Sequence, residues 1–289
     1  GAIWLAEYNI ILPINTMDIA TENAVYSSEE ARAQTVERIH ELDIHTGDEI
    51  ENLYHSVVRT TEDMVDTIEN VERQNEVISR LQNGLILVLA DMVESRAKCT
   101  GDHVRKTAAY ADIILRELKR EGVYTDQLTE AFMQDVVNSA PLHDVGKIQV
   151  SDAILNKPSR LTDEEFAIMK SHAAVGRKLL KDAVEATEHS SFLDTAIDMA
   201  GAHHEWWNGK GYPDGIAGEI IPLSARIMAI ADVFDALVSK RVYKPGMPLE
   251  KAYAIIREET GTHFDPVCVE ALFKAQEKIE RVLNSHADD

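Results

Sequence analysis

The sequence predicts an all-α fold, and three features of the chain lead to this prediction. No segment of useful length alternates between apolar and polar residues, which is the pattern of a half-buried strand. Residues 14–140 contain no proline, so long helices can form over this stretch. Between residues 50 and 85, apolar side chains recur every seven positions, which is typical of a coiled coil.

The N-terminal part of the chain begins with an apolar segment and continues with helix signals. Residues 1–10 are apolar enough to be the cytoplasmic end of a transmembrane helix, and an amphipathic N-terminal helix is the alternative. Pro13, a helix-like run, a connector and the segment Gly47-Asp48-Glu49-Ile50 follow. Together they resemble a HAMP domain, the parallel four-helix relay of bacterial transmembrane receptors, over residues 11–64. The resemblance implies a soluble fragment of a protein that sits at the cytoplasmic side of the bacterial inner membrane.

The heptad repeat predicts a coiled-coil linker over residues 50–85. Its six members follow one another without a gap: Ile50, Val57, Met64, Val71, Ile78 and Leu85. Such a stripe favours a left-handed supercoil with a second copy of the helix. We therefore expect a parallel homodimer, formed through the coiled coil and the HAMP-like segment. The alternative is a single amphipathic helix that lies on the remainder of the chain.

Helix signals continue towards the C-terminus. Thr162-Asp163-Glu164-Glu165 is a capping box and predicts a helix that carries His172. Pro222 suits the first turn of a further helix, which carries Asp232. Between these two helices, residues 208–218 form a glycine-rich turn region. No strand is expected here either.

Composition limits the classes of function. With 289 residues, of which 45% are hydrophobic, the chain can bury at least one core of ordinary size. It has 50 Asp and Glu against 29 Lys and Arg, which argues against binding of DNA or RNA polymers. A phosphate substrate must therefore be held by local positive charge. The two cysteines, Cys99 and Cys268, offer no disulfide framework, which fits a reducing cytosol.

A set of histidines and aspartates has the composition of a multinuclear metal site. The seven residues are His103, His143, Asp144, His172, His203, His204 and Asp232. They are too far apart in sequence to come from one loop, so several helices must assemble the site around the adjacent His143-Asp144 pair. Nitrogen and oxygen ligands without thiolate suit iron or manganese, with zinc and nickel as further candidates. This pattern indicates a metal-dependent hydrolase.

The surrounding motifs identify a family. Five of them follow one another in order: Leu142-His143-Asp144-Val145-Gly146-Lys147-Ile148, His172, His203-His204-Glu205-Trp206-Trp207-Asn208-Gly209-Lys210-Gly211-Tyr212-Pro213, Asp232-Val233-Phe234-Asp235-Ala236-Leu237 and Gly261-Thr262-His263-Phe264-Asp265-Pro266. In this order the motifs resemble the HD-GYP family of cyclic di-GMP phosphodiesterases, over about residues 85–283. The resemblance implies that residues 86–289 form an HD-GYP catalytic domain.

Two cations about 3.5–4 Å apart can activate water and neutralise the oxygens that gain charge during phosphodiester hydrolysis. A carboxylate can bridge two cations, whereas an imidazole nitrogen binds one, so Asp144 is the expected bridge. The resemblance implies that His103, His143 and Asp232 complete one metal and that His172 with His203 or His204 completes the other. Some family members bind a third metal through a Glu one turn before the first His. Cys99 stands there, so two metals are expected, although Glu94 or Glu205 could substitute.

The resemblance also implies how the substrate is held. Lys147 matches a family lysine that reaches the scissile phosphate, so Lys147 and Asp144 are the expected catalytic residues. Arg241 and Lys244 match residues that hold the second phosphate, and a solvated basic helix end is the alternative. Gly211-Tyr212-Pro213 would form a stiff turn beside the site, with Tyr212 against ligand or loop; a purely structural turn is the alternative. Asp235 is expected to support a metal ligand or Arg241.

The expected function is hydrolysis of cyclic di-GMP to linear pGpG, with further cleavage to GMP left open. Two alternatives come from the same residues. The site could serve another cyclic dinucleotide or a different phosphate ester, because a metal centre recognises phosphate and the residues that contact the bases cannot be identified from sequence. The chain could also be a sensor that binds a dinucleotide without turnover, although a sensor would be expected to have lost metal ligands.

Overall fold

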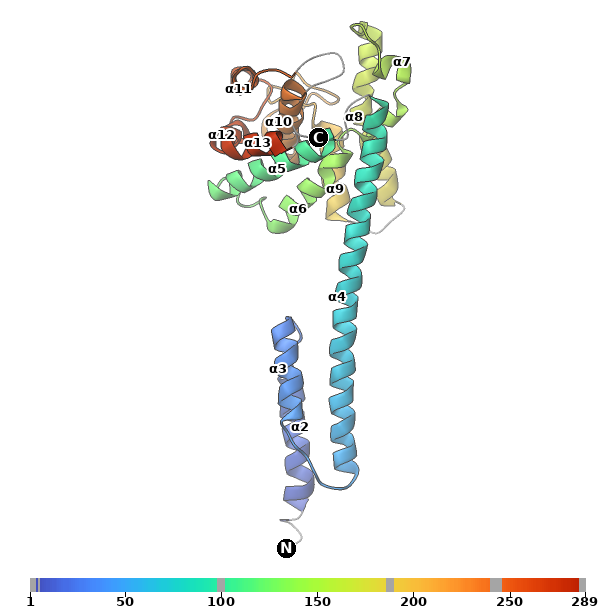
Figure 1. Ribbon diagram of the computed structural model, residues 1–289, viewed down its shortest axis with the longest axis vertical. Helices are drawn as coiled ribbons and strands as arrows, with labels where there is room; N and C mark the ends of the chain where they lie inside the picture. Colours follow the sequence, from blue (N-terminus) through green and yellow to red (C-terminus); the bar gives the residue numbers. More distant parts are fainter. Residues whose placement is uncertain (1–3, 5, 98–101, 186–189, 240–245, 286–289) are drawn as a thin grey trace. The chain divides into compact units, whose positions relative to one another are not determined.

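The computed structural model describes residues 4, 6–97, 102–185, 190–239 and 246–285 (Figure 1). Within these ranges the chain is helical and contains no strand, only one isolated bridge between Thr260 and Phe264. The predicted all-α class is therefore confirmed. The chain divides into two compact units, Gly1–Gln82 and Asn83–Asp289, which are described separately below.

The first unit contains the π-helix η1 (Glu7–Ile11), α2 (Leu12–Glu22), α3 (Glu29–His40) and the beginning of α4 (Glu49–Arg96). Its small core is formed by four buried residues: Met17, Ile39, Ile44 and Tyr54. Arg32 in α3 pairs with Glu72 at 2.8 Å, and His40 pairs with Glu62 at 2.8 Å, so α3 runs antiparallel to α4. The connector expected between two HAMP-like helices is thus largely a helix itself, and the HAMP assignment stays a prediction.

The apolar N-terminal segment is exposed in this chain. Trp4 is 68% exposed and Leu12 is 51% exposed, while residues 1–3 and residue 5 lie outside the described part. Among the residues that the structure describes, no helix is long and apolar enough to cross a membrane. The expectation that residues 1–10 end a transmembrane helix is therefore still a prediction.

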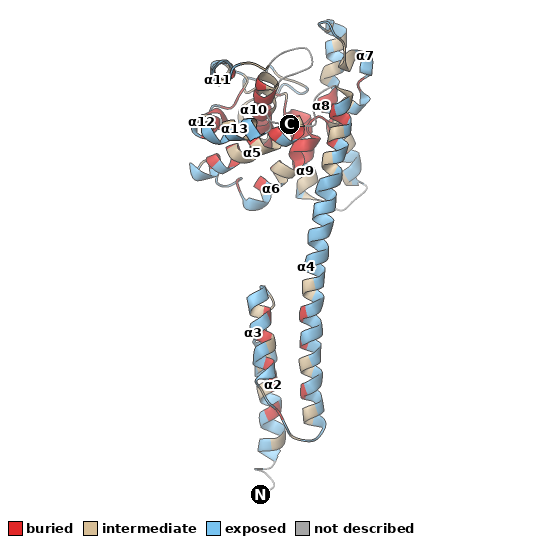
Figure 2. Cartoon of the chain, viewed as in Figure 1, coloured by how far each residue is buried: buried red, intermediate tan, exposed pale blue. Residues whose placement is uncertain are grey.

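Helix α4 carries the predicted heptad stripe. It begins after Asp48, whose side chain accepts a hydrogen bond from the Ile50 N–H at 2.9 Å, as an N-cap does. The first two members of the stripe, Ile50 and Val57, pack against the core of the first unit. The other four are exposed: Met64 47%, Val71 49%, Ile78 51% and Leu85 63%. Figure 2 shows the exposed middle of α4.

The heptad pattern extends beyond its predicted end. The next position after Leu85 is Met92, which is 59% exposed, and Leu81 and Val88 occupy the companion positions at 62% and 49% exposure. The opposite side of the same helix is buried in the second unit through Ala90, Val93 and Glu94. The last turns of α4 therefore have one side packed and one apolar side open.

The second unit continues with nine α-helices and three short 3₁₀ segments in its described part. They are α5 (Asp102–Arg120), α6 (Glu130–Ser139), η2 (Ala140–Leu142), η3 (Val145–Gln149), α7 (Asp152–Leu155), α8 (Asp163–Glu185), α9 (Ser191–Ala202), η4 (Gly218–Ile220), α10 (Leu223–Val238), α11 (Leu249–Glu258), α12 (Pro266–Lys274) and α13 (Gln276–Ser285).

Four of these elements are short: α7 is a single α-helical turn, and η2, η3 and η4 are 3₁₀ turns. Together the longer helices surround one large hydrophobic core.

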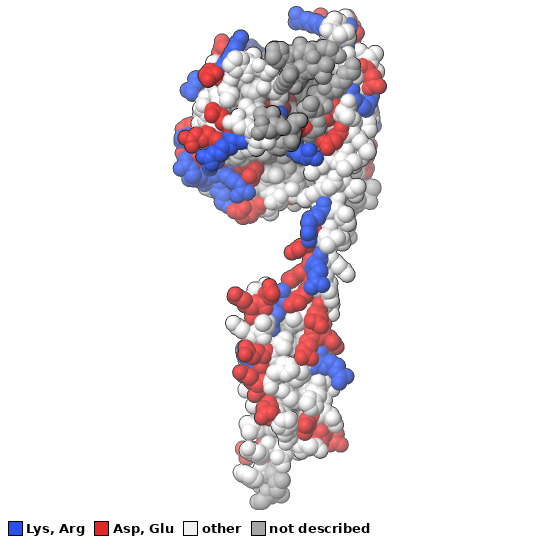
Figure 3. Space-filling view, in the orientation of Figure 1, with Lys and Arg blue, Asp and Glu red and all other residues white. Residues whose placement is uncertain are grey.

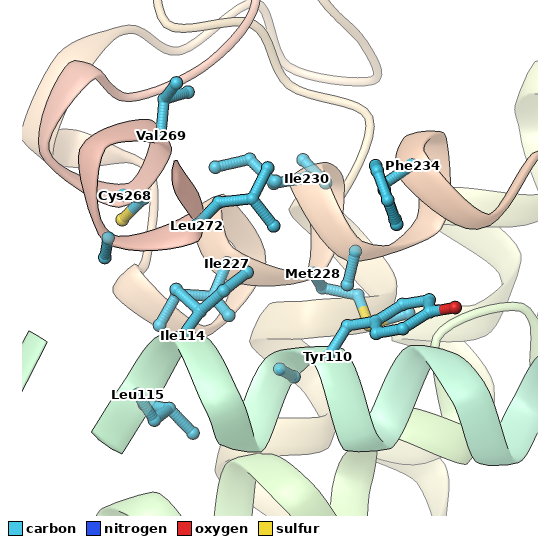
Figure 4. Close-up of a cluster of buried hydrophobic side chains, with 14 of the residues drawn as sticks. Tyr110, Ile114, Leu115, Ile227, Met228, Ile230, Phe234, Cys268, Val269 and Leu272 are labelled. Carbon is cyan, nitrogen blue, oxygen red and sulfur yellow. The ribbon is translucent and has the colours of Figure 1, made fainter. Parts of the chain in front are cut away.

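That core lies between α5, α10 and α12. Figure 4 shows Tyr110, Ile114 and Leu115 of α5 facing Ile227, Met228, Ile230 and Phe234 of α10 and Cys268, Val269 and Leu272 of α12. These side chains are almost completely buried, and each is worth roughly 1.5–3 kcal/mol relative to exposure. Cys268 is a buried free thiol among them. The core thereby fixes α5 and α10, which carry His103 and Asp232.

Two predicted helix signals can be compared with the structure. The capping box forms as expected, because the Thr162 N–H donates to Glu165 Oε2 at 2.8 Å and the Glu165 N–H donates to Thr162 Oγ1 at 3.3 Å. It starts α8, which carries His172. Pro222 is the residue just before α10 rather than a member of its first turn, a difference of one position.

Candidate metal centre

Five parts of the second unit contribute the candidate metal ligands. His103 is in the first turn of α5, the His143-Asp144 pair lies between η2 and η3, and His172 is in α8. His203 and His204 follow α9 directly, and Asp232 is in α10. The structure brings all seven together in two groups whose ligand atoms lie within 4.8 Å of one another: Asp144, His172, His203 and His204 in one group, and His103, His143 and Asp232 in the other.

The histidine rings are held in one orientation by hydrogen bonds on their far side. Nδ1 of His143 donates to the Ala140 carbonyl at 2.8 Å, Nδ1 of His172 to Met169 at 2.6 Å, and Nδ1 of His203 to Met199 at 3.0 Å. Because a carbonyl can only accept, each ring carries its proton on Nδ1 when neutral. The Nε2 lone pairs therefore face inward, as they do in histidines that bind metals.

Asp144 lies between the two groups and turns one oxygen towards each. Its Oδ2 is 3.2 Å from His143 Nε2, whereas its Oδ1 is 3.3 Å from His172 Nε2 and 3.7 Å from His203 Nε2. In the second group, His103 Nε2 lies 3.4 Å from Asp232 Oδ1. This is the arrangement that a carboxylate bridging two cations requires.

The atoms at the centre fit bound cations. Four of them are buried and have no hydrogen-bond partner among the described residues: Nε2 of His143, His172 and His203, and Oδ1 of Asp144. Leaving a buried polar atom unpaired costs about 1–3 kcal/mol, so four neighbouring cases in a native fold call for a ligand. Imidazole nitrogen and carboxylate oxygen, the two atom types found here, are common ligands of divalent cations.

The charge states of the site also suit cations. Burial disfavours the charged carboxylate of Asp144, but Lys147 and His143 outweigh this and hold its pKa well below the usual range. Burial, assisted by the neighbouring His143, lowers the pKa of His203 to about 3. Burial likewise holds the pKa of His204 well below its usual value. At neutral pH the site therefore offers a charged carboxylate at Asp144 and neutral imidazoles at His203 and His204. At His143 burial would lower the pKa, but the charge of Asp144 outweighs burial and raises this pKa to about 9.

Residues 87–268 match the HD domain family, which covers more than half of the chain. The chain belongs to the HD domain family. The order of the motifs predicts this family, and the match confirms the prediction. The adjacent His143-Asp144 pair lies at the centre of this domain, with one residue in each ligand group.

Three curated proteins of Vibrio cholerae serotype O1 are similar to this HD domain chain. A "Cyclic di-GMP phosphodiesterase" is 44% identical over 247 residues, which is 86% of this chain and 49% of that protein. A "Probable cyclic di-GMP phosphodiesterase" is 38% identical over 76% of this chain and 50% of that protein. A "3'3'-cGAMP-specific phosphodiesterase 2" is 36% identical over 72% of this chain and 37% of that protein. The chain spans half or less of the length of these relatives.

Asp235 supports His103 in the HD domain, as the sequence suggested for it. His103 Nδ1 lies 2.7 Å from Asp235 Oδ2, which gives a carboxylate–histidine pair behind a candidate metal ligand. Ser239 donates to the other oxygen of Asp235 at 2.8 Å, and Lys106 Nζ lies 3.2 Å from it. Sequence reasoning missed Lys106 and Ser239, although their positions one turn beyond His103 and Asp235 are a signal that could have found them.

Lys147 reaches the centre of the HD domain from η3. Its ammonium is hydrogen-bonded to Asp144 Oδ2 and lies 3.2 Å from Glu94 Oε1. The predicted catalytic pair, Lys147 and Asp144, is thus in contact. Glu94 comes from α4 and belongs to neither group of candidate ligands in the described part of the chain. Its position as a partner of Lys147 was not predicted.

The turn that contains Gly211, Tyr212 and Pro213 lies beside the metal ligands. The Tyr212 ring stacks on the His204 ring with centroids 4.7 Å apart. A Cβ on Gly211 would come within 2.3 Å of the Trp206 backbone nitrogen, so this close chain approach needs glycine. The turn lies beside the candidate ligands, as predicted from the sequence. Contact of these three residues with substrate remains a prediction.

Glu205 holds this turn through two hydrogen bonds to its backbone. Its Oε1 accepts hydrogen bonds from the backbone N–H of Asp214 at 2.7 Å and of Gly215 at 3.2 Å. Glu205 is buried and is absent from both groups of candidate ligands within the described residues. Its Oε1 therefore supports the turn, whereas its Oε2 is buried without a hydrogen-bond partner among the described residues, and the third-metal role considered from sequence stays a prediction.

The motif at residues 261–266 anchors the same loop. The Trp207 N–H donates to the His263 carbonyl at 2.9 Å, and the Asn208 N–H donates to the Thr262 carbonyl at 3.0 Å. The Trp206 ring stacks on the His263 ring at 4.6 Å. This motif therefore supports the site by anchoring the loop.

Three residues named from sequence lie outside the described part of the chain, namely Cys99, Arg241 and Lys244.

Proposed function

We propose that this chain is the catalytic part of a bacterial signalling protein and hydrolyses cyclic di-GMP to linear pGpG with the help of two divalent cations, iron or manganese. The observation that carries the proposal is the position of Asp144, which turns one carboxylate oxygen towards each group of candidate ligands. The seven proposed ligands are those of the two groups described above. Relatives named for hydrolysis of cyclic dinucleotides support the choice of substrate class.

Each part of the site has a task in this proposal. Bound cations would activate water and neutralise charge on the phosphate oxygens. Asp144 would keep them at a fixed separation, and the buried histidines would hold them with neutral nitrogen ligands. The Lys147 ammonium, which is largely shielded from solvent with 19% side-chain exposure, would stabilise negative charge that develops on the scissile phosphate. Tyr212 would border the bound nucleotide.

Hydrolysis of a different cyclic dinucleotide is the second candidate. It is favoured by the similarity to a relative named as specific for 3'3'-cGAMP. The purified chain, loaded with Mn²⁺ or Fe²⁺, should be incubated separately with cyclic di-GMP and 3'3'-cGAMP, and the products separated by chromatography. We expect faster conversion of cyclic di-GMP, with pGpG as the first product. Faster conversion of 3'3'-cGAMP would make 3'3'-cGAMP the proposed substrate in place of cyclic di-GMP. Binding without any product would favour the sensor alternative.

Removal of the charge on Arg241 or Lys244 should separate binding from cleavage. If these residues hold the second phosphate, alanine at either position should weaken the affinity for cyclic di-GMP by about tenfold to a hundredfold, since hydrogen bonds to charged groups contribute roughly 1.5–3 kcal/mol. Hydrolysis of bis-nitrophenyl phosphate, which has a single phosphodiester, should stay nearly unchanged. Calorimetry and an absorbance assay measure the two effects. Lys251→Ala in α11 is the control, and equal losses on both substrates would contradict the role.

We also propose that two copies form a parallel dimer along α4. The exposed stripe of Met64, Val71, Ile78 and Leu85 supports this, because each aliphatic side chain gains roughly 1.5–3 kcal/mol when buried. Residues 11–64 would act as the HAMP-like relay of a receptor at the cytoplasmic side of the inner membrane. In this arrangement a receptor signal would pass along the paired helices towards residues 83–96.

The dimer predicts a specific sensitivity to charge. Val71→Asp combined with Ile78→Asp should dissociate it, because carboxylates that face each other in a buried seam are costly. These two positions are chosen because Val57 packs in the core of the first unit, where a charge would also disturb folding. Ser79→Asp with Asn83→Asp adds the same charge at exposed positions off the stripe and should leave the dimer intact. Analytical ultracentrifugation decides, and a wild-type monomer at micromolar concentration would exclude this dimer.

A further inference from the structure

Glu94 is a buried carboxylate whose role the proposed function does not explain. It lies in the last turn of α4 and is 2% exposed. Its Oε1 lies 3.2 Å from the Lys147 ammonium, and its Oε2 has no hydrogen-bond partner among the described residues. A buried carboxylate is stable only when a positive charge compensates it, and Lys147 is the cation that the structure places beside it.

The end of α4 is fastened to the segment that follows Lys147. The Arg96 guanidinium donates to the Ile148 carbonyl at 2.8 Å, to the Val150 carbonyl at 3.1 Å and to Asp152 Oδ1 at 2.8 Å. The Asn156 side chain donates in return to the Arg96 carbonyl at 2.6 Å. The last turns of α4 and the chain from residue 147 to residue 156 therefore hold each other in place. Glu94 approaches Lys147 from this fixed base.

Lys147 has two carboxylate partners, and they differ in what they can do when the site is loaded. Asp144 is the proposed bridge between the cations, so its charge would be shared with them, and the cations would repel the ammonium. Within the described residues Glu94 stands outside both ligand groups, so its charge stays available to Lys147. Without Glu94, no carboxylate outside the ligand groups would offset the repulsion between the cations and the Lys147 ammonium. The flexible lysine side chain would then turn away from the centre.

We propose that Glu94 is a positioning residue that holds the Lys147 ammonium at the metal centre, where it can act on the scissile phosphate. The inference rests on the proposed function, because it takes phosphate as the target of Lys147. It adds a direct link between α4 and the reaction, since the place of the last turns of α4 sets the place of Lys147. Glu94 itself touches neither substrate nor cations in this scheme.

The first test measures Lys147 directly and needs no substrate. The Mn²⁺-loaded chain is treated with an amine-acylating reagent, and modification of each lysine is followed by mass spectrometry. Glu94→Gln keeps the size of the side chain and removes its charge. We expect this variant to acylate at Lys147 several-fold faster than wild type, because the ammonium loses its hydrogen bond to Glu94 and the side chain is free to reach the reagent. Asp91→Asn, the same change one turn earlier in α4, should leave the rate unchanged.

The second test is a double-mutant cycle on turnover. Glu94→Gln should lower kcat roughly tenfold with little change in KM, since an interaction made in the transition state is lost. Lys147→Met should lower kcat further, and adding Glu94→Gln to Lys147→Met should then cost nothing more, because the residue acts through Lys147. Metal content and thermal unfolding of each variant verify that the fold and the centre remain.

The outcomes separate this inference from the proposed function. Unchanged acylation of Lys147 in Glu94→Gln, or losses that multiply in the double variant, would overturn the positioning role. An equal effect of Asp91→Asn would overturn it as well, because the effect would then come from charge in general. If Glu94→Gln speeds acylation but wild type hydrolyses no cyclic dinucleotide, the link between Glu94 and Lys147 stands and the proposed substrate fails. In that case bis-nitrophenyl phosphate replaces the dinucleotide in the cycle.

Discussion

Asp144→Ala should abolish turnover of cyclic di-GMP and lower the metal content of the folded chain. Asp144 has one oxygen 3.2 Å from His143 Nε2 and the other 3.3 Å from His172 Nε2, so its loss removes a ligand from both proposed cations at once. The carboxylate charge that compensates them disappears with it. Because metals at such centres provide both the activated water and the charge stabilisation, activity should fall to background.

Elemental analysis of the purified variant measures the metal, and product chromatography measures turnover. Asp126→Ala, which removes an exposed carboxylate from the same unit, should leave both unchanged. Circular dichroism shows whether the variant is folded. A folded Asp144→Ala chain that keeps its full metal content would rule out the bridging role, whatever its activity.

Gly146→Ala should damage the same centre by a different route, through packing. A Cβ on Gly146 would lie 1.9 Å from the His172 carbonyl oxygen and 2.5 Å from the Gly176 backbone nitrogen, and backbone cannot turn aside as a side chain does. The η3 segment would have to move away from α8, which separates Asp144 from His172. We expect a loss of stability of about 1–3 kcal/mol from overpacking, together with weaker metal binding.

Gly84→Ala is the matched control, because a Cβ there would meet nothing within 4 Å. Gly84 is exposed and lies away from both ends of α4, where alanine favours the helix by about 1 kcal/mol relative to glycine. The two glycine-to-alanine changes should therefore move the melting temperature in opposite directions, with metal content affected only by Gly146→Ala. Thermal unfolding followed by circular dichroism tests this, and an unaltered melting temperature in Gly146→Ala would show that η3 and α8 are not held by this close contact.

The helices that surround the site could be predicted from local signals. The capping box at Thr162 and the heptad stripe along α4 involve residues that are neighbours in sequence, and such short-range patterns do not depend on the remainder of the fold. The end of α4 was harder to predict from sequence. The stripe was predicted to end at Leu85, yet the helix continues to Arg96, because its other side finds a partner in the buried surface of the second unit.

The contacts behind the ligands could not be predicted in the same way. Glu94 and Lys147 are 53 positions apart, and Asp235 and His103 are 132 apart, so no periodic pattern connects them. A lone carboxylate in a helix is most often a solvated group. Only the packing of α4 and α10 against the site shows which carboxylates are buried and which cation each one faces.

The sequence by itself determined the all-α class, the seven candidate ligands and the family, because residue types and their order along the chain carry this information. It also indicated the carboxylate that could serve two cations, since a carboxylate has two oxygens and an imidazole offers one nitrogen. The tertiary structure decided which oxygen of Asp144 faces which histidine, that Glu205 is engaged by backbone amides, and that Glu94 meets Lys147. The reason is physical: burial and pairing of charges depend on distances between helices, and these distances are fixed only when the core has packed.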